Sequence, residues 1–409
     1  MSAAPAGPAL PARSVGTLGI ALLALNGMIG AGIFGVPAGA AALAGPWSPL
    51  VFVACGLLLA AVMLCFAEIA SRFDRTGGPI LYVQTAFGDF AGFQTGWAFY
   101  IARATAFAAN LNLLLASLAW LWPPADDGAV RIALLALLMG ALAWVNVLGI
   151  DRAVRALGVL TALKLVPLVA LVVAGLAWLA PAGAELARTP PPPLRDFGLA
   201  ALLVVYAFVG WESAVVPAGE TRNPQRSIPV ALFAALACAT LLYVAVQAVA
   251  VAVLPGLADS ERALVDVGRA LMGVPGALLL TAGVVVSVAG NVAGTMISAP
   301  RLTYAMARER WLPGGFDRLH PVHGTPHVSI VVFAVLTFAL AAVGSFLWLA
   351  AMSAMVRVLI YMGCIAAMPR LRRETGPAGL RLPGGWTIPL IAFSASLLLL
   401  IQVDRDAVA

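Results

Sequence analysis

The chain has 409 residues, of which 62% are hydrophobic and only 10% are charged. Water-soluble domains carry about 25% charged residues, so this composition excludes an ordinary soluble protein and predicts a polytopic membrane protein. The formal net charge of +6 comes mostly from arginines between the apolar segments, and it offers no case for nucleic-acid binding.

Apolar runs of membrane-spanning length recur along the whole chain. A helix needs roughly 20 apolar residues to cross a bilayer, and about eleven segments meet this criterion. In chain order they are 17–41, 49–70, 91–121, 132–149, 159–179, 198–217, 229–253, 276–304, 327–343, 347–368 and 388–403.

The loops between these segments predict the orientation. If the amino terminus is cytoplasmic, fourteen arginines fall in inside loops and six in outside loops. Cytoplasmic loops are enriched in Lys and Arg, so we expect a multi-pass protein of the cell membrane with residues 1–16 as a cytoplasmic tail. This tail lacks the features of a removable signal peptide.

The first and sixth segments are interrupted. Residues 26–37 contain four glycines and Pro37, and residues 206–213 contain Gly210 with Pro217 and Gly219 close behind. Irregular backbone at membrane depth survives only where it is buried in protein or lines a cavity, because lipid cannot bond the freed N–H and C=O groups. Both interruptions are therefore candidate binding sites.

The positions of the interruptions suggest an internal repeat. The first and sixth segments run in opposite directions, so 17–180 and 197–368 form two halves of opposite topology, each opening with an interrupted helix. This pattern is typical of inverted-repeat secondary transporters that hold substrate at the bilayer midplane. Residues 369–409 add a cytoplasmic loop and one further spanning helix.

The glycines of the first interruption also fit two alternatives. Gly30 to Gly35 spell GxGxxG, the dinucleotide-binding fingerprint, but the motif follows no short strand. The next acidic residue, Glu68, lies well beyond the roughly 20-residue spacing of that motif. For Gly27 and Gly35, close helix packing accounts for the glycines equally well.

The interrupted segments resemble a known family. Residues 29–35 (IGAGIFG) look like the first-helix signature of the amino acid, polyamine and organocation transporters. Residues 208–212 (FVGWE) and 223–229 (NPQRSIP) resemble the sixth helix and its following loop, with further echoes at 301–308, 325–327 and around Lys164. The resemblance implies an all-α, leucine-transporter-type fold with ten core helices in two inverted bundles of five and discontinuous helices one and six.

The resemblance also implies a backbone substrate site. Amides of Gly30, Ala31 and Gly32 would hold the substrate carboxylate, since a helix amino terminus attracts anions. Carbonyls of Tyr206 and Val209 would meet its ammonium, and the Tyr206 ring would face the substrate or the outer path. Ala31 lacks the hydroxyl that some relatives have there. The full candidate set is Ile29, Gly30, Ala31, Gly32, Tyr206, Phe208, Val209 and Gly210.

Lys164 is the only lysine of the chain, inside an apolar run. Intramembrane charges are costly and usually functional. By the resemblance, its ammonium would occupy the place of a sodium ion in sodium-coupled relatives, beside the carbonyls of Asn26 and Ile29 and the side chain of Asn291. Burial disfavours a charged lysine, so proton loss would release this link and couple protons to transport. The alternative is a structural lysine that snorkels.

Glu212 is a second candidate for a buried, functional charge. It either gates the site or relays protons, or it ties the broken helix to Arg103 or Arg357 through an ion pair. The two arginines are expected to be structural. Glu68, at an inner boundary, is expected to be a solvated or capping group.

These observations predict a secondary transporter of amino acids or related amines that works by alternating access. It would be independent of sodium, and either proton-coupled or an exchanger. The alternative is a channel for protons or substrate that uses Lys164 and Glu212. The chain has no P-loop and no nucleophile with its base, so neither a primary pump nor an enzyme is expected. No cofactor or metal site is expected from His320, His323 and His327, whereas oligomerisation is left open.

Overall fold

The computed structural model describes residues 16–73, 77–148, 157–179, 188–214, 224–374, 380–382 and 384–402. Within these ranges nearly every residue is helical and none lies in a strand. The fold class is therefore all-α, as the composition and the resemblance predict.

Seven longer helices precede residue 176: α1 (Thr17–Met28), α2 (Gly32–Ala44), α3 (Ser48–Ala70), α4 (Gly78–Phe87), α5 (Asp89–Ala119), α6 (Gly128–Leu148) and α7 (Leu157–Gly175). The later helices are α9 (Leu194–Phe208), the 3-10 turn η5 (Trp211–Ala214), α10 (Pro224–Val253), α11 (Ala263–Arg308), α12 (His327–Val343), α13 (Phe346–Glu374) and α14 (Thr387–Ile401).

Six helical stretches of the described part are long and apolar enough to cross a membrane: Gly32–Ala70, Asp89–Ala119, Gly128–Leu148, Arg226–Val253, Ala263–Arg308 and Phe346–Glu374. Four shorter apolar helices accompany them: Thr17–Met28, Leu163–Trp178, His327–Val343 and Thr387–Ile401. Every predicted apolar segment overlaps a helix, while the number of crossings and the inverted repeat stay predictions.

Two features of the helices differ from the predicted spanning segments. Helix α4 was missed because its ten residues are too short for a spanning segment. It packs against α5 and α13, and its buried residues include Pro79, Tyr82 and Val83. Helix α11 begins earlier than predicted and bends at Gly273, where φ is 65°, a conformation that favours glycine.

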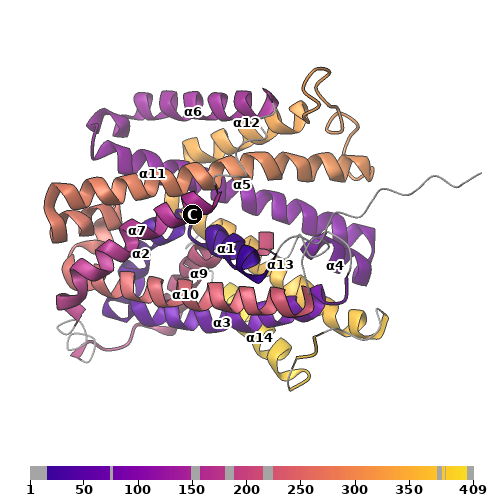
Figure 1. The fold of residues 1–409 in the computed structure, drawn as a ribbon, viewed down its shortest axis with the longest axis horizontal. Coiled ribbons are helices and arrows are strands. Elements are labelled where there is room, and N and C mark those ends of the chain that lie inside the picture. The colour runs from indigo at the N-terminus through magenta and orange to yellow at the C-terminus, as the bar shows by residue number, and fades with distance from the viewer. Residues whose placement is uncertain are drawn as a thin grey trace, which may run out of the picture.

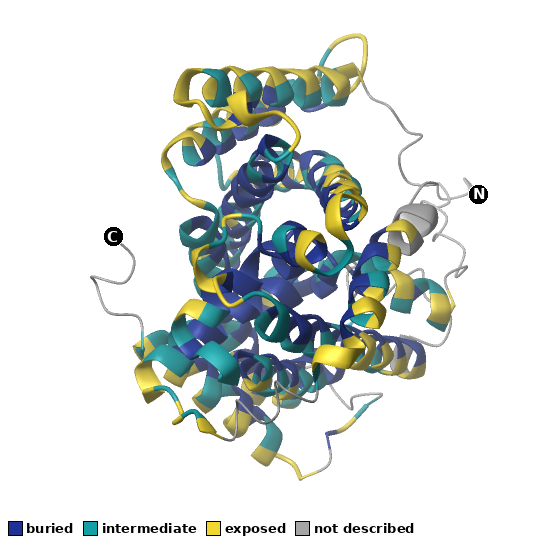
Figure 2. Ribbon diagram, turned by 90° about the vertical axis from the view of Figure 1, so that its left-hand side faces the viewer, coloured by how far each residue is buried: buried dark blue, intermediate teal, exposed yellow. Residues whose placement is uncertain are grey.

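The interrupted helices lie in the centre of the bundle (Figure 1). Helix α2 packs on α9, and α1 packs on η5 and α10, while α3, α5, α11 and α13 surround them. Buried residues gather in this central region, and exposed residues lie mainly on the outer helices (Figure 2). On α6 the exposed residues include Leu137, Trp144 and Val145, as expected for a surface in contact with lipid.

A candidate substrate site between two interrupted helices

The first interruption separates α1 from α2. The chain leaves helical geometry at Ile29, where ψ is 82°, and α2 begins at Gly32. The Gly30 N–H group donates to the Met28 carbonyl at 2.8 Å, so this amide is already bonded within the break. The first amides of a helix have no carbonyl partner inside the helix, so the start of α2 presents donors and a positive dipole end.

The carbonyl end of α1 is bonded by side chains from three other helices. Tyr243 Oη of α10 donates to the Met28 carbonyl at 2.9 Å, and Ser287 Oγ of α11 to the Ile29 carbonyl at 3.4 Å. Lys164 Nζ of α7 lies 2.8 Å from Asn26 Oδ1 and 3.4 Å from the Asn26 carbonyl. Lys164 therefore contacts Asn26, one of the three neighbours expected for it, while the Ile29 carbonyl accepts from Ser287.

The second interruption follows α9. Val209 is extended, with ψ of 162°, and Gly210 has φ of 107°, a region that side chains rarely adopt. The Gly210 N–H group donates to Glu212 Oε2 at 2.7 Å. A Cβ atom on residue 210 would clash with the Gly27 carbonyl oxygen, so the position has no room for one.

Glycines also let the two interrupted helices touch. A Cβ atom on residue 32 would lie 2.5 Å from Ala207 Cα, so α2 meets α9 backbone to backbone. Gly27 and Gly210 form the corresponding contact between α1 and the second break. Gly35 packs differently, since a Cβ atom there would strike the Phe346 ring. Close packing thus accounts for Gly35, one of the two glycines for which the sequence leaves this alternative open, whereas Gly27 also lines the cavity described next.

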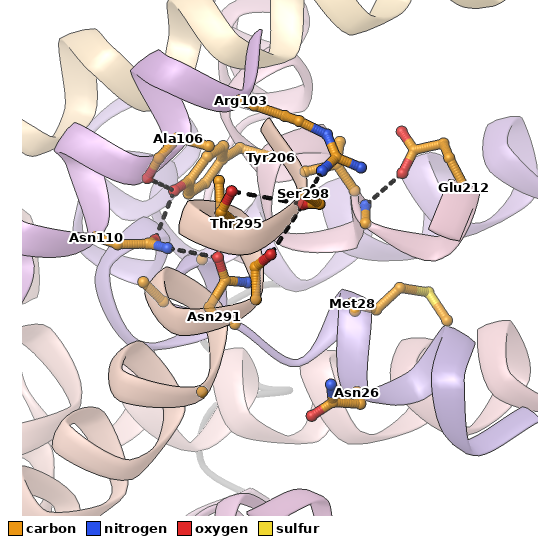
Figure 3. A pocket seen from close by; sticks show the side chains of 18 of the residues that line it. Asn26, Met28, Arg103, Ala106, Asn110, Tyr206, Glu212, Asn291, Thr295 and Ser298 are labelled. Carbon is orange, nitrogen blue, oxygen red and sulfur yellow. Dashed lines mark hydrogen bonds between the residues drawn. The ribbon is translucent and has the colours of Figure 1, made fainter. Parts of the chain in front are cut away.

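A cavity of about 380 Å³ opens beside both breaks. Its lining comes from α1, the two breaks, α5, the last turn of α9, α11 and α13 (Figure 3). Six of the predicted substrate-binding residues line it: Gly30, Ala31, Gly32, Tyr206, Val209 and Gly210. Ile29 and Phe208 lie outside the lining. Phe208 packs instead against the rings of Phe52 and Tyr243.

An ion pair closes one side of this cavity. Glu212 is 1% exposed, and Arg357 Nη1 of α13 lies 2.8 Å from its Oε1. Tyr361, one turn further along α13, donates to the same oxygen. The ion pair holds η5 against α13, so of the two arginines considered, Arg357 is the partner of Glu212.

A chain of polar side chains crosses the opposite side. Tyr206 Oη lies 3.0 Å from Asn110 Oδ1, and Asn110 Nδ2 donates to Asn291 Oδ1 at 2.8 Å. These bonds connect α9, α5 and α11 at the end of α9 (Figure 3). Asn291, expected beside Lys164, is instead bonded to Asn110 and lines the cavity.

Comparison with known proteins decides the family. The family model described as amino acid permease matches residues 15–403. The chain belongs to the amino acid permease family. The resemblance seen in the sequence is thereby confirmed, and the protein is a multi-pass membrane permease and not an enzyme.

Individual relatives of this permease differ in what their names say they carry. It is 30% identical to an uncharacterized transporter of Mycobacterium bovis, over 81% of this chain and 74% of the relative. It is 26% identical to the methylthioribose transporter of Bacillus subtilis, over 77% of this chain and 71% of the relative. It is also 26% identical to the branched-chain amino acid permease BcaP of Lactococcus lactis, over 94% of this chain and 88% of the relative.

Several residues of the permease's cavity were missed or undervalued from sequence. Asn110 was not considered, although an asparagine inside the predicted spanning segment 91–121 is itself a signal. Arg103 was expected to be structural, yet it lines the cavity and donates to Ser298 Oγ. Thr295 and Ser298, which also line the cavity, were not singled out from sequence.

Glu68 corrects a prediction. It is 1% exposed and not solvated, because Arg372 contacts both carboxylate oxygens at 2.7 Å. Arg72 Nη2 and the Leu382 N–H group also donate to it, each at 3.1 Å. The cluster fastens the end of α3 to the end of α13, through Arg372, 304 residues away, and to the segment that follows, through Leu382.

The histidine loop shows no ligand set. His320 and His323 stack at 4.8 Å between ring centroids, and His327 meets His320 edge-on at 5.7 Å. Across the described residues, no group of three or more His, Cys, Asp or Glu side chains is placed to hold a metal ion.

Proposed function

We propose that this permease is a secondary transporter that carries an amino acid or a related amine by alternating access, independent of sodium and either proton-coupled or exchanging. One observation carries the proposal: the amino end of α2 and the carboxyl end of α9 meet at the same cavity. A helix amino terminus attracts anions and a carboxyl terminus attracts cations. The pair therefore matches the two charges of a zwitterion.

The bonding at the breaks sharpens the roles of the backbone groups. Gly30 has its N–H group bonded to Met28, so the amides of Ala31 and Gly32 are the proposed donors for the substrate carboxylate. The carbonyls of Tyr206 and Val209 are the proposed acceptors for the ammonium, since both residues line the cavity where α9 ends. The proposed substrate is thus held mainly by peptide groups.

The lining also favours one state of the transport cycle. Of the two helices on either side of the first break, α1 lines the cavity, whereas α2 contributes only Gly32. The cavity also continues along α11 from Gly290 to Ser298. With a cytoplasmic amino terminus, this is the inner side of the breaks. We therefore propose an inward-facing state, in which the bonds among Tyr206, Asn110 and Asn291 close the outer path.

Proton coupling is proposed to act through Lys164. Its ammonium, 0% exposed, joins α7 to α1 at Asn26, which also lines the cavity. A deprotonated amine would hold Asn26 less strongly, because a charged donor makes the stronger hydrogen bond. Loss of the proton would then free α1 to move. The two halves 17–180 and 197–368 are the proposed moving repeats.

Counterflow in proteoliposomes tests the transporter proposal against the channel alternative. Labelled amino acid should enter faster when the vesicles contain unlabelled amino acid, without sodium, because a carrier returns loaded. Methylthioribose serves as the matched neutral ligand. An uptake rate that does not depend on internal substrate would favour a channel. A strict sodium requirement would refute the coupling proposal. Transport of methylthioribose, without transport of any amino acid, would refute the zwitterion site.

A further inference from the structure

The cavity has an unbalanced charge. Its charged lining residues are Arg103, Arg357 and Glu212, which give two positive charges and one negative. Glu212 forms its ion pair with Arg357, so the described lining offers no second carboxylate for Arg103. Lys164, which touches the lining residue Asn26, adds a third cation nearby.

The two guanidinium groups share one aromatic ring. Arg103 Cζ lies 4.9 Å from the centroid of the Phe99 ring, and Arg357 Cζ lies 5.6 Å from it. An aromatic face attracts a cation but does not neutralise it. The ring thus holds both guanidinium groups at one wall of the cavity and leaves the excess charge in place.

The donors of these arginines are only partly used. Arg103 Nη1 donates to Ser298 Oγ, and a guanidinium carries five N–H donors. The buried Nε of Arg357 has no hydrogen-bond partner in the described part of the chain. Arg103 is half-buried and Arg357 is 6% exposed, so both face the cavity from a largely apolar wall where charges attract more strongly than in bulk water. An anion bound in the cavity would balance the excess positive charge.

Resting on the proposed function, we infer that the preferred substrate is an amino acid whose side chain bears a carboxylate, and that Arg103 binds this second carboxylate. The first carboxylate and the ammonium of such a substrate use the helix ends, which leaves the side-chain carboxylate for the arginine wall. Arginine suits this role because its planar fork matches a carboxylate. Ser298 holds the guanidinium in place (Figure 3).

The size of the cavity agrees with a small substrate. About 380 Å³ lies near the lower end of the range of roughly 300–1,000 Å³ for ligand pockets, so it suits a single amino acid better than a peptide. A free inorganic anion, such as chloride, is the other source of the missing charge, and the experiment separates the two.

The test compares acids with their amides in the full-length permease. Counterflow of labelled glutamate and aspartate is measured against glutamine and asparagine, in proteoliposomes with and without chloride. We expect the acids to be preferred roughly tenfold or more, since a hydrogen-bonded charge contact has about that effect. In Arg103→Gln the preference should disappear while the amides are still exchanged.

Arg301→Gln is the matched control. Arg301 lies on α11 three residues beyond Ser298 but is exposed and outside the cavity lining, so this variant should keep the wild-type preference. Equal or better exchange of the amides by the wild type, a chloride requirement for amide exchange, or an unchanged ratio in Arg103→Gln would each overturn the inference. Should Arg103→Gln not fold, the wild-type ratio decides alone. Exchange of none of the four amino acids would refute the proposed function itself.

Discussion

The two interruptions expose the same kind of backbone groups and bond them in different ways. At the first, separate donors from α7, α10 and α11 each bond one residue at the end of α1. At the second, one carboxylate, Glu212, accepts the freed Gly210 amide and is itself held by Arg357 and Tyr361 of a single helix. Several independent bonds therefore hold the first break, whereas an ionic cluster lies at the centre of the second.

This difference predicts unequal sensitivity to mutation. Hydrogen bonds from different helices are lost one at a time, and each contributes about 1 kcal/mol. A buried ion pair behaves otherwise, because removal of one partner leaves the other charge uncompensated away from water. Variants at the second break should thus cost more stability than variants at the first.

The largest effect is expected for Glu212→Gln. It leaves the Arg357 guanidinium buried without its counter-charge and should lower the free energy of unfolding by about 3 kcal/mol. Thermal unfolding of the purified protein in detergent measures the loss. Replacing both partners, as Glu212→Gln with Arg357→Met, should recover part of it, because no unpaired charge remains.

Glu374→Gln supplies the control for this variant. Glu374 pairs with Arg370 at 2.8 Å, the same distance as the buried pair, but its side chain is 48% exposed. Exposed pairs contribute about 0–1 kcal/mol, so this variant should unfold almost as the wild type does. Equal losses in Glu212→Gln and Glu374→Gln would contradict the ionic account of the second break.

The intermediate effect is expected for Lys164→Met. Removing the ammonium takes away its bonds to Asn26 and should lower stability by about 1–2 kcal/mol. The stronger readout is transport against pH. In the wild type, rising pH removes the lysine proton and weakens the link between α7 and α1. The transport rate should therefore change at alkaline pH. The variant has no proton to lose there, and a wild-type pH profile in Lys164→Met would refute the coupling proposal.

Sequence reasoning located the breaks because their signals are local. Glycines and prolines inside apolar runs placed the first break within 26–37, and α9 does end at Phe208. It did not locate pairings that depend on packing. The partner of Glu68 lies 304 residues away, and the bond of Asn291 to Asn110 joins α11 to α5.

The direction of individual side chains was also beyond the sequence. Phe208 and Val209 are neighbours, yet only Val209 lines the cavity while Phe208 packs against Phe52 and Tyr243. Each residue along a helix points about 100° away from the one before it. A motif whose helix boundary is uncertain by two residues therefore cannot predict which side chain faces the cavity. Arg103 was undervalued for the same reason, since an intramembrane arginine can face a cavity or a neighbouring helix.

The smallest effect is expected for Tyr243→Phe, which removes one hydroxyl at the first break and keeps the ring against Phe52 and Phe208. The Met28 carbonyl still accepts from the Gly30 N–H group, so no buried acceptor is left unpaired, and the loss should be about 1 kcal/mol. Tyr100→Phe is the control, because its buried hydroxyl has no partner within the described residues, and its loss should leave stability unchanged or slightly higher. Thermal unfolding of both variants measures the difference. A loss for Tyr243→Phe as large as that for Glu212→Gln would mean that the first break depends on a single bond, and the contrast between the two interruptions would fail.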